Sequence, residues 1–298
     1  MTRNNRETIR EVLLRTSRLF EEEGIRAPLY NAEMILQDVL GVDKTGMLLR
    51  FDEPFPETCK EELAWFVQLR ESHVPLQHIL GYQEFYGRKF SVSYDVLIPR
   101  PETELLVEQV LKQRPHFQAP GRGPLLVDIG TGSGAIAVTL AAEWPELRVI
   151  AIDLSPDALE MARKNAREHG VEERITFMLG DLYLPLIERG LRPDIVVSNP
   201  PYIPSADCEE LDAEVRDFEP RLALDGGEDG LDPYRRITGA LPQLWPIEGP
   251  AFVAFEVGIH QDRDVEQMIA DSVPGVETGI LPDLQGIGRV IWGLRTSL

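Results

Sequence analysis

From residue 125 onward the chain alternates short apolar strands, turns and amphipathic helices, and this alternation constrains the fold more than any other feature. Its first repeat contains Val127-Asp128-Ile129-Gly130-Thr131-Gly132-Ser133-Gly134, between a predicted strand at 125–129 and a predicted helix at 135–143. Such repetition builds a parallel sheet covered by helices on both faces, with ligands bound at the carboxyl ends of the strands. We therefore predict an α/β fold with a Rossmann-like sheet.

The same alternation continues to the end of the chain. Apolar runs predict further strands at 148–152, 175–179, 194–198 and 251–257, and helical periodicity predicts helices at 157–169, 233–244 and 261–270. Residues 276–281 and 289–292 are predicted to form a closing strand pair. Between the fourth strand and the helix at 233 we expect a long loop.

The first 80 residues have a different pattern. Apolar residues recur at helical spacing over 6–70, with breaks at Gly24, Pro28 and Gly41, so we expect a bundle of short helices. Aromatic and β-branched residues around Gly87-Arg88 then predict a β-hairpin. The predicted domains are a helical substrate-recognition domain at 1–80, a hairpin linker at 81–98 and a larger domain at 99–298.

Charge and composition narrow the class of partner. The formal net charge is −20, and residues 125–298 alone carry 14 basic against 31 acidic side chains. A nucleic-acid binder generally needs a cationic surface, because neutralising phosphates supplies most of its affinity. We therefore expect a protein or small-molecule partner and no direct contact with nucleic acid.

Targeting and metal signals are weak. Residues 1–10 lack the apolar core of a signal peptide, and no apolar run is long enough for a bilayer, so we expect a soluble, cytoplasmic protein without a membrane partner. Cys59 and Cys208 are too few for a disulfide framework or a structural zinc site. The histidines are scattered without metal-ligand spacing, so we predict no metal site.

The glycine-rich turn predicts a cofactor site. Glycines without β-carbons let a ligand approach the backbone, so we expect Gly130, Thr131, Gly132, Ser133 and Gly134 to contact a nucleotide-type cofactor. The second strand ends at Asp153, at the spacing typical of an acid that binds both ribose hydroxyls. These features alone would fit NAD equally well.

The residues after the fourth predicted strand favour S-adenosylmethionine over NAD as the cofactor. They read Ser198-Asn199-Pro200-Pro201-Tyr202, for which hydride transfer has no use. If the Asn199 side-chain oxygen and the Pro200 carbonyl both accept hydrogen bonds from one NH2 group, they favour a pyramidal nitrogen as a methyl group arrives. Pro200 and Pro201 stiffen the turn, and Tyr202 offers a flat face to a planar group. We therefore predict an S-adenosylmethionine-dependent methyltransferase acting on a planar amide or amino nitrogen, with Asn199, Pro200 and Tyr202 as catalytic residues.

A second pair of residues is assigned to the cofactor by analogy with the class I methyltransferase fold. Asp181 and Leu182 follow the third strand, where an adenine-contacting pair would lie. A surface turn explains the pair equally well. Asn199, which borders both ligands in this interpretation, is also expected to contact the cofactor.

Longer motifs resemble the HemK/PrmC family, the glutamine N5-methyltransferases that modify peptide-chain release factors. The similar blocks are Pro75-Leu76-Gln77-His78-Ile79-Leu80-Gly81, Leu97-Ile98-Pro99-Arg100-Pro101-Glu102-Thr103-Glu104 and Phe218-Glu219-Pro220-Arg221-Leu222-Ala223-Leu224-Asp225-Gly226-Gly227. Together with Asn-Pro-Pro-Tyr they span nearly the whole chain. The resemblance implies that the 130–134 turn holds the methionine part of S-adenosylmethionine, Asp153 the ribose, and residues 199–202 the glutamine amide of a Gly-Gly-Gln loop. Where the family often has an aromatic residue beside the adenine, this chain has Leu182, followed by Tyr183.

Three alternatives stay open at this stage. The first is a glutamine methyltransferase acting on a ribosomal protein, against which the 75–81 block argues by resemblance. The second is an adenine-N6 methyltransferase on DNA or RNA, disfavoured by 11 acidic against 2 basic residues over 207–232. The third is a binding module that kept the cofactor fold without activity, against which the presence of both Asp153 and Asn199 argues.

Overall fold

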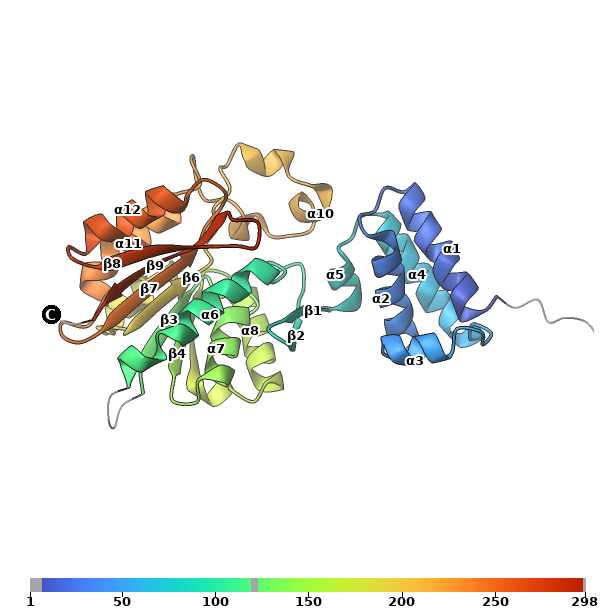
Figure 1. The fold of residues 1–298 in the computed structure, drawn as a ribbon, viewed down its shortest axis with the longest axis horizontal. Helices are drawn as coiled ribbons and strands as arrows, with labels where there is room; N and C mark the ends of the chain where they lie inside the picture. The colour runs from blue at the N-terminus through green and yellow to red at the C-terminus, as the bar shows by residue number, and fades with distance from the viewer. Residues whose placement is uncertain (1–6, 119–122, 297–298) are drawn as a thin grey trace, which may run out of the picture. The chain divides into compact units, whose positions relative to one another are not determined.

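A computed structural model describes residues 7–118 and 123–296, which fall into two compact units (Figure 1). The first unit comprises Met1–Gly81 together with Ala213–Phe218, and the second comprises Tyr82–Asp212 and Glu219–Leu298. Each unit has its own apolar core.

The first unit is a bundle of short helices (Figure 1). Its elements are α1 (Ile9–Glu22), α2 (Pro28–Leu40), α3 (Lys44–Leu49), η1 (Glu57–Cys59), α4 (Lys60–Glu71), α5 (Leu76–Leu80) and the distant α10 (Ala213–Arg216). The first helix begins at a capping box, because the Thr8 hydroxyl accepts from the Glu11 amide at 3.2 Å and the Glu11 carboxylate accepts from the Thr8 amide at 2.8 Å. Phe20, Ile35 and Leu36 are fully buried between the helices.

A buried arginine holds the sequence-distant segment in this unit. Arg70, whose side chain is only 3% exposed, donates from Nε to Asn31 Oδ1 at 2.7 Å and from Nη2 to Glu214 Oε1 at 2.5 Å. A third bond runs from Nη1 to the carbonyl of Val74 at 3.1 Å. Residues 213–218 lie within the predicted larger domain by chain order, but their contacts group them with the helical unit.

The second unit contains a two-stranded hairpin and a seven-stranded sheet (Figure 1). The hairpin strands are β1 (Tyr82–Phe85) and β2 (Arg88–Ser91). The sheet has the order β5-β4-β3-β6-β7-β9-β8, with strands β3 (Leu125–Ile129), β4 (Arg148–Asp153), β5 (Ile175–Leu179), β6 (Ile195–Ser198), β7 (Ala251–Glu256), β8 (Glu277–Pro282) and β9 (Gly288–Arg295). The strands from β5 to β7 are parallel, and β9 and β8 pair antiparallel beyond them. The carboxyl ends of β3, β4, β5 and β6 therefore meet at one edge of the sheet.

Helices cover both faces of this sheet, as successive strand residues require. Leu126 packs into the core on one side and Val127 into the core on the other, because neighbouring strand residues point to opposite faces. The first side is covered by α6 (Glu104–Lys112), α7 (Ala135–Glu143) and α8 (Pro156–Glu168), and the second by α9 (Leu184–Arg189), α11 (Asp232–Leu244) and α12 (Asp262–Ser272). Short 3-10 turns complete the unit: η2 (Pro101–Thr103), η3 (Arg114–Phe117), η4 (Glu172–Arg174), η5 (Asp207–Glu210) and η6 (Arg221–Ala223).

The predicted Rossmann-like α/β fold is confirmed, and the predicted strands and helices of the larger domain agree with the observed ones to within a few residues at their ends. The predicted hairpin and closing strand pair are also present. Helices α6 and α9 were not predicted, and the expected long loop contains short helical turns. Among the helices of the described residues, none is long and apolar enough to cross a membrane.

Candidate active site

A cavity of about 530 Å³ opens at the edge where the carboxyl ends of four parallel strands meet. This volume lies in the range of small-molecule binding sites. Its wall includes most of the residues singled out from the sequence: Gly130, Thr131, Gly132 and Ser133 after β3, Asp153 at the end of β4, Asp181 and Leu182 after β5, and Asn199 and Pro201 after β6. Gly134, Pro200 and Tyr202 do not line it.

The glycines of the first turn have two different tasks. Gly130, Gly132 and Gly134 all have positive φ angles of 72°, 55° and 81°, which side chains rarely adopt. A β-carbon on Gly130 or Gly132 would meet nothing within 4 Å, and both residues line the cavity, so their missing side chains leave room for a ligand. A β-carbon on Gly134 would instead lie 3.0 Å from the Ala162 side chain in α8. Gly134, which was expected to contact the cofactor, thus allows close packing of the helices.

Asp153 connects the end of β4 to the glycine turn that follows β3. Its Oδ2 accepts from the Gly132 amide at 2.8 Å, and its Oδ1 accepts from the Ser155 amide at 2.9 Å. A carboxylate has about four acceptor positions, so Asp153 can still accept from ligand hydroxyls. Burial raises the pKa of Asp153 above its ordinary value, against the opposing effect of these hydrogen bonds. The group is a strong acceptor beside the space that the glycines leave.

The pair after β5 forms another part of the wall. Asp181 Oδ2 pairs with Arg236 Nη2 at 2.6 Å, and both residues line the cavity. Leu182 adopts a left-handed backbone conformation with φ 48°, which is uncommon for a branched side chain. Such outliers concentrate at functional sites. Arg236 lies on α11 and could not be paired with Asp181 from sequence spacing.

The Asn-Pro-Pro-Tyr turn is anchored to the neighbouring strand. Ser198 Oγ donates to the Ile129 carbonyl at 2.6 Å, which ties the end of β6 to the end of β3 immediately before Asn199. Asn199 and Pro201 then form part of the cavity wall. The Tyr202 ring packs against the core on the α11 side, and burial raises its pKa to about 12. The turn therefore presents Asn199 to the cavity from a rigid base.

A second glycine-rich segment, residues 226–230, packs against the Asn-Pro-Pro-Tyr turn. The Gly226 amide donates to the Ile203 carbonyl at 2.8 Å, and a β-carbon on Gly226 would lie only 2.7 Å from the Pro201 carbonyl oxygen. A β-carbon on Gly230 would collide with the Tyr202 carbonyl oxygen. Only glycine permits this approach, so the segment 226–230 packs directly on the backbone of the Asn-Pro-Pro-Tyr turn.

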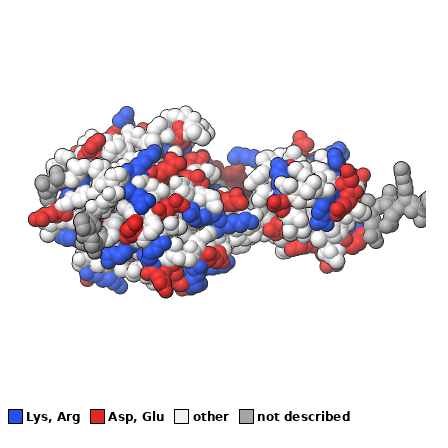
Figure 2. Space-filling view, turned by 60° about the horizontal axis from the view of Figure 1, so that its bottom comes forward, with Lys and Arg blue, Asp and Glu red and all other residues white. Residues whose placement is uncertain are grey.

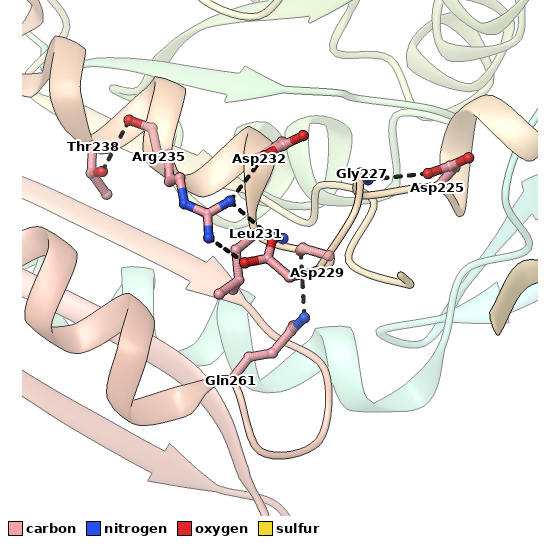
Figure 3. A network of polar contacts seen from close by, with 9 residues as sticks. Asp225, Gly227, Asp229, Leu231, Asp232, Arg235, Thr238 and Gln261 are labelled. Carbon is pink, nitrogen blue, oxygen red and sulfur yellow. Dashed lines mark hydrogen bonds and ion pairs between the residues drawn. The ribbon is translucent and has the colours of Figure 1, made fainter. Parts of the chain in front are cut away.

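Polar contacts hold that segment in place (Figure 3). Arg235 on α11 binds both Asp229 and Asp232, the latter at 2.9 Å, so one guanidinium bridges the end of the segment and the start of the helix. Gln261, from the other side, donates to the carbonyls of Tyr202 at 2.9 Å and Gly230 at 3.4 Å. Asp229 and Asp232, two of the acidic residues in this part of the chain, therefore form ion pairs that hold the segment 226–230 in position.

Two further polar pairs near the cavity were missed by sequence reasoning. Arg100 Nη2 binds both oxygens of Glu219 at 2.8 and 2.7 Å, and the Glu219 side chain is 1% exposed. The Thr103 hydroxyl donates to Glu256 Oε2 at 2.6 Å. Arg100, Thr103 and Glu219 occur in the motif blocks described above, but nothing in the sequence says which residue contacts which.

The residues around the cavity fit S-adenosylmethionine. The glycine turn leaves ligand space, Asp153 offers carboxylate lone pairs for the two ribose hydroxyls, and Leu182 lines the wall with an apolar side chain. Within the described residues there is no cluster of side chains suited to a metal ion. The strand ends place hydrogen-bond acceptors such as Asp153 around this small-molecule site.

Comparisons with known proteins agree with this geometry. Residues 101–214 match the family described as the methyltransferase small domain, and residues 11–81 match the PrmC N-terminal domain. Among solved structures, the hMettl16 catalytic domain in complex with MAT2A 3′UTR hairpin 6 has a TM-score of 0.54 at 15% identity, covering 80% of this chain and 82% of that one, a likeness that concerns the fold alone. Fold, site and family match together define an S-adenosylmethionine-dependent methyltransferase of the Rossmann-like class.

Full-length relatives narrow the class further. The chain is 42% identical to the release factor glutamine methyltransferase of Geobacter sulfurreducens, with 96% of each chain covered. It is 42% identical to that of Bacillus cereus, with 87% of this chain and 90% of the relative covered, and 38% identical to that of Moorella thermoacetica, with 97% and 99% covered. The chain belongs to the release factor glutamine methyltransferase family.

Proposed function

We propose that this enzyme transfers a methyl group from S-adenosylmethionine to the side-chain amide nitrogen, N5, of the glutamine in the Gly-Gly-Gln motif of peptide-chain release factors. The observation that carries this proposal is the position of Asn199 in the wall of the cavity that the glycine turn and Asp153 also line. A methyl acceptor held by Asn199 would lie in the same cavity as the cofactor. Membership of the release factor glutamine methyltransferase family supports the choice of glutamine as acceptor.

The cofactor would occupy the part of the cavity next to the carboxyl end of β3. Gly130, Thr131, Gly132 and Ser133 would hold its methionine part, and Asp153 would accept from its ribose hydroxyls. Asp181 and Leu182 would border its adenine. When bound, S-adenosylmethionine supplies an activated methyl group on its sulfonium.

The protein's contribution to the chemistry is to localise a lone pair. An amide nitrogen is a poor nucleophile because its lone pair is delocalised into the carbonyl group. Asn199 Oδ1 and the Pro200 carbonyl oxygen would each accept a hydrogen bond from the substrate NH2 group and stabilise the positive charge that develops on nitrogen. Pro201 stiffens the turn, and the Tyr202 ring, which packs against the core and does not line the cavity, would support the turn instead of bordering the planar amide. No strong base is needed, since positioning supplies most of the rate enhancement.

A release factor as substrate would place the enzyme's work in the cytoplasm. The acidic segment after Asn199 supports a protein rather than a nucleic-acid substrate, because it would repel a phosphate backbone. On the face of the larger unit drawn in Figure 2, red acidic and blue basic side chains are interspersed. A mixed surface of this kind offers partners to side chains of either charge.

A labelling experiment tests this function against the alternatives. Purified enzyme with a labelled methyl donor would be given a release factor, DNA and a large-subunit ribosomal protein in parallel. We expect label on the release factor, located by mass spectrometry to the glutamine of Gly-Gly-Gln. Label on the DNA or on the ribosomal protein alone would overturn the proposed substrate, and no label on any of them would favour a binding module.

A further inference from the structure

We propose that Thr103 and Glu256 are positioning residues that determine which end of the Asn199 side-chain amide faces the substrate. The proposal rests on the function proposed above, in which Asn199 Oδ1 accepts a hydrogen bond from the glutamine amide. Thr103 is the last residue of η2, directly before α6, and Glu256 ends β7. Neither residue was identified as part of the site from the sequence.

The orientation of Asn199 needs a determinant of its own. The two ends of an asparagine amide have nearly the same size and shape, so packing alone does not distinguish them. They differ in chemistry, because the oxygen only accepts hydrogen bonds and the nitrogen only donates them. An asparagine turned the wrong way would present an NH2 group to the substrate NH2 group and could not hold it.

A chain of hydrogen bonds provides that determinant. Thr103 Oγ1 donates to Glu256 Oε2 at 2.6 Å, and Asn199 Nδ2 donates to Thr103 Oγ1 at 3.3 Å. A threonine hydroxyl has a single proton, and an ionised carboxylate can only accept. Once that proton is directed to Glu256, Thr103 can only accept from Asn199, so the amide nitrogen turns toward Thr103. The amide oxygen is then the end left for the substrate.

Burial makes this chain effective. Thr103 is 4% exposed and Glu256 is 1% exposed, so water has little access to replace either partner. The sheet register brings them to Asn199, because Ser198 and Phe255 are paired on the adjacent strands β6 and β7, and Asn199 and Glu256 are the next residues along. Burying a carboxylate is costly unless it accepts hydrogen bonds, and the Thr103 hydroxyl supplies one to Glu256.

The direction in which these hydrogen bonds are donated depends on the charge of Glu256. Burial raises the pKa of Glu256 to about 7, while the Thr103 hydrogen bond opposes the shift. The other groups that face it are charged or titratable: Arg289, Arg100, Glu102, Tyr202 and Tyr234. Protonated Glu256 can donate to Thr103, whose own proton is then free for Asn199 Oδ1, and this reverses the amide. Turnover that depends on this chain should therefore rise as the pH increases through about 7.

Threonine variants test the proposal in the full-length enzyme. Thr103→Val removes the hydroxyl with little change of shape, and we expect kcat on a Gly-Gly-Gln-containing release factor to fall by about tenfold at saturating cofactor. Thr103→Ser restores the hydroxyl and should recover most of that loss. Thr139→Val is a matched control, because Thr139 is a fully buried threonine whose hydroxyl has no hydrogen-bond partner among the described residues. It should leave kcat unchanged.

A double-mutant cycle separates positioning from general damage. If Thr103 acts through Asn199, Thr103→Val should reduce kcat by less than about twofold in an Asn199→Ala background, because the orientation no longer matters there. A tenfold loss in both backgrounds would refute the proposal. Cofactor affinity measured by calorimetry should change little in Thr103→Val, and an equal loss of affinity would point to a distorted cavity instead.

The pH profile gives a second, independent test. Glu256→Gln has no group that ionises in this range, so we expect the rise of kcat through pH 7 to be lost. A Glu256→Gln enzyme with the wild-type profile would refute the proposal even if Thr103→Val failed to fold. Failure of the proposed function would look different, because the wild-type enzyme itself would then not methylate the glutamine amide.

Discussion

Alanine substitutions at two glycines of the same turn should affect different properties, cofactor affinity at one position and stability at the other. Gly132 and Gly134 both have positive φ angles, so either alanine variant carries the same kind of backbone strain. The new methyl group of Gly132→Ala would point into open space at the cavity wall, whereas that of Gly134→Ala would meet α8. The first variant should lose cofactor affinity and the second should lose stability.

The magnitudes follow from these surroundings. A left-handed alanine costs about 1 kcal/mol at either position. At Gly134 the added β-carbon lies 3.0 Å from the Ala162 side chain and 3.1 Å from its Cα, and helix backbone cannot move aside easily. Overpacking adds about 1–3 kcal/mol, so Gly134→Ala should lower the free energy of unfolding by about 2–4 kcal/mol. Gly132→Ala should weaken S-adenosylmethionine binding by at least about tenfold, or roughly 1.4 kcal/mol.

Calorimetry and urea denaturation separate the two effects, with Gly170→Ala as a matched control. Gly170 has a positive φ of 67° and open space around its β-carbon position, but it lies in the exposed turn after α8, away from the cavity. It should show the backbone cost without any change in affinity. Wild-type affinity in Gly132→Ala, or an equal loss of affinity in Gly170→Ala, would show that the cofactor does not occupy the space left by the glycine turn.

Three further predictions concern single side chains. Asp153→Ala should weaken S-adenosylmethionine binding by roughly 1–3 kcal/mol, because two ribose hydroxyls lose a charged acceptor, and unchanged affinity in calorimetry would exclude the ribose assignment. Asn199→Ala should reduce kcat by about 100-fold or more with little change in cofactor affinity, while Asn199→Asp, which keeps an acceptor oxygen, should retain measurable turnover; near wild-type kcat in the alanine variant would leave Asn-Pro-Pro-Tyr as a structural turn. Since burial raises the pKa of Glu256 from 4.5 to about 7, the folded state binds that proton more tightly than the unfolded state, so stability should fall as the pH rises from 6 to 8. Glu256→Gln should reduce this dependence in urea denaturation, while the part contributed by Asp128, whose pKa burial also raises to about 7, should remain; an unchanged slope would contradict the prediction.

The sheet could be predicted from the sequence because its signals are local. A buried parallel strand is a short run of apolar residues, and a helix covering it repeats its apolar residues every three or four positions. Each signal lies within one element, as in Ile195-Val196-Val197 before Asn199. The positions of the glycine turn, Asp153 and Asn199 follow directly, because parallel strands bring their carboxyl ends to one edge of the sheet.

The polar partners around the cavity could not be predicted in this way. Thr103 and Glu256 are 153 residues apart in the chain, Arg100 and Glu219 are 119 apart, and Asp181 and Arg236 are 55 apart. No periodicity links residues on different elements at such separations. For the same reason the sequence placed 213–218 with its chain neighbours, although Glu214 contacts Arg70 in the helical unit.

Three carboxylates beneath the cavity indicate what kind of site these strands build. Asp128 accepts from the Thr131 hydroxyl at 2.7 Å, Asp153 from the Gly132 amide at 2.8 Å, and Glu256 from the Thr103 hydroxyl at 2.6 Å. Burial raises the pKa of all three, so each one destabilises the folded protein when it is ionised near neutral pH. Each acid also fixes one section of the cavity wall, because a charged acceptor holds its donor more firmly than a neutral one does. The destabilising acids are therefore best explained as the means by which the wall is ordered before any ligand binds, which is what catalysis by fixed hydrogen-bond acceptors requires.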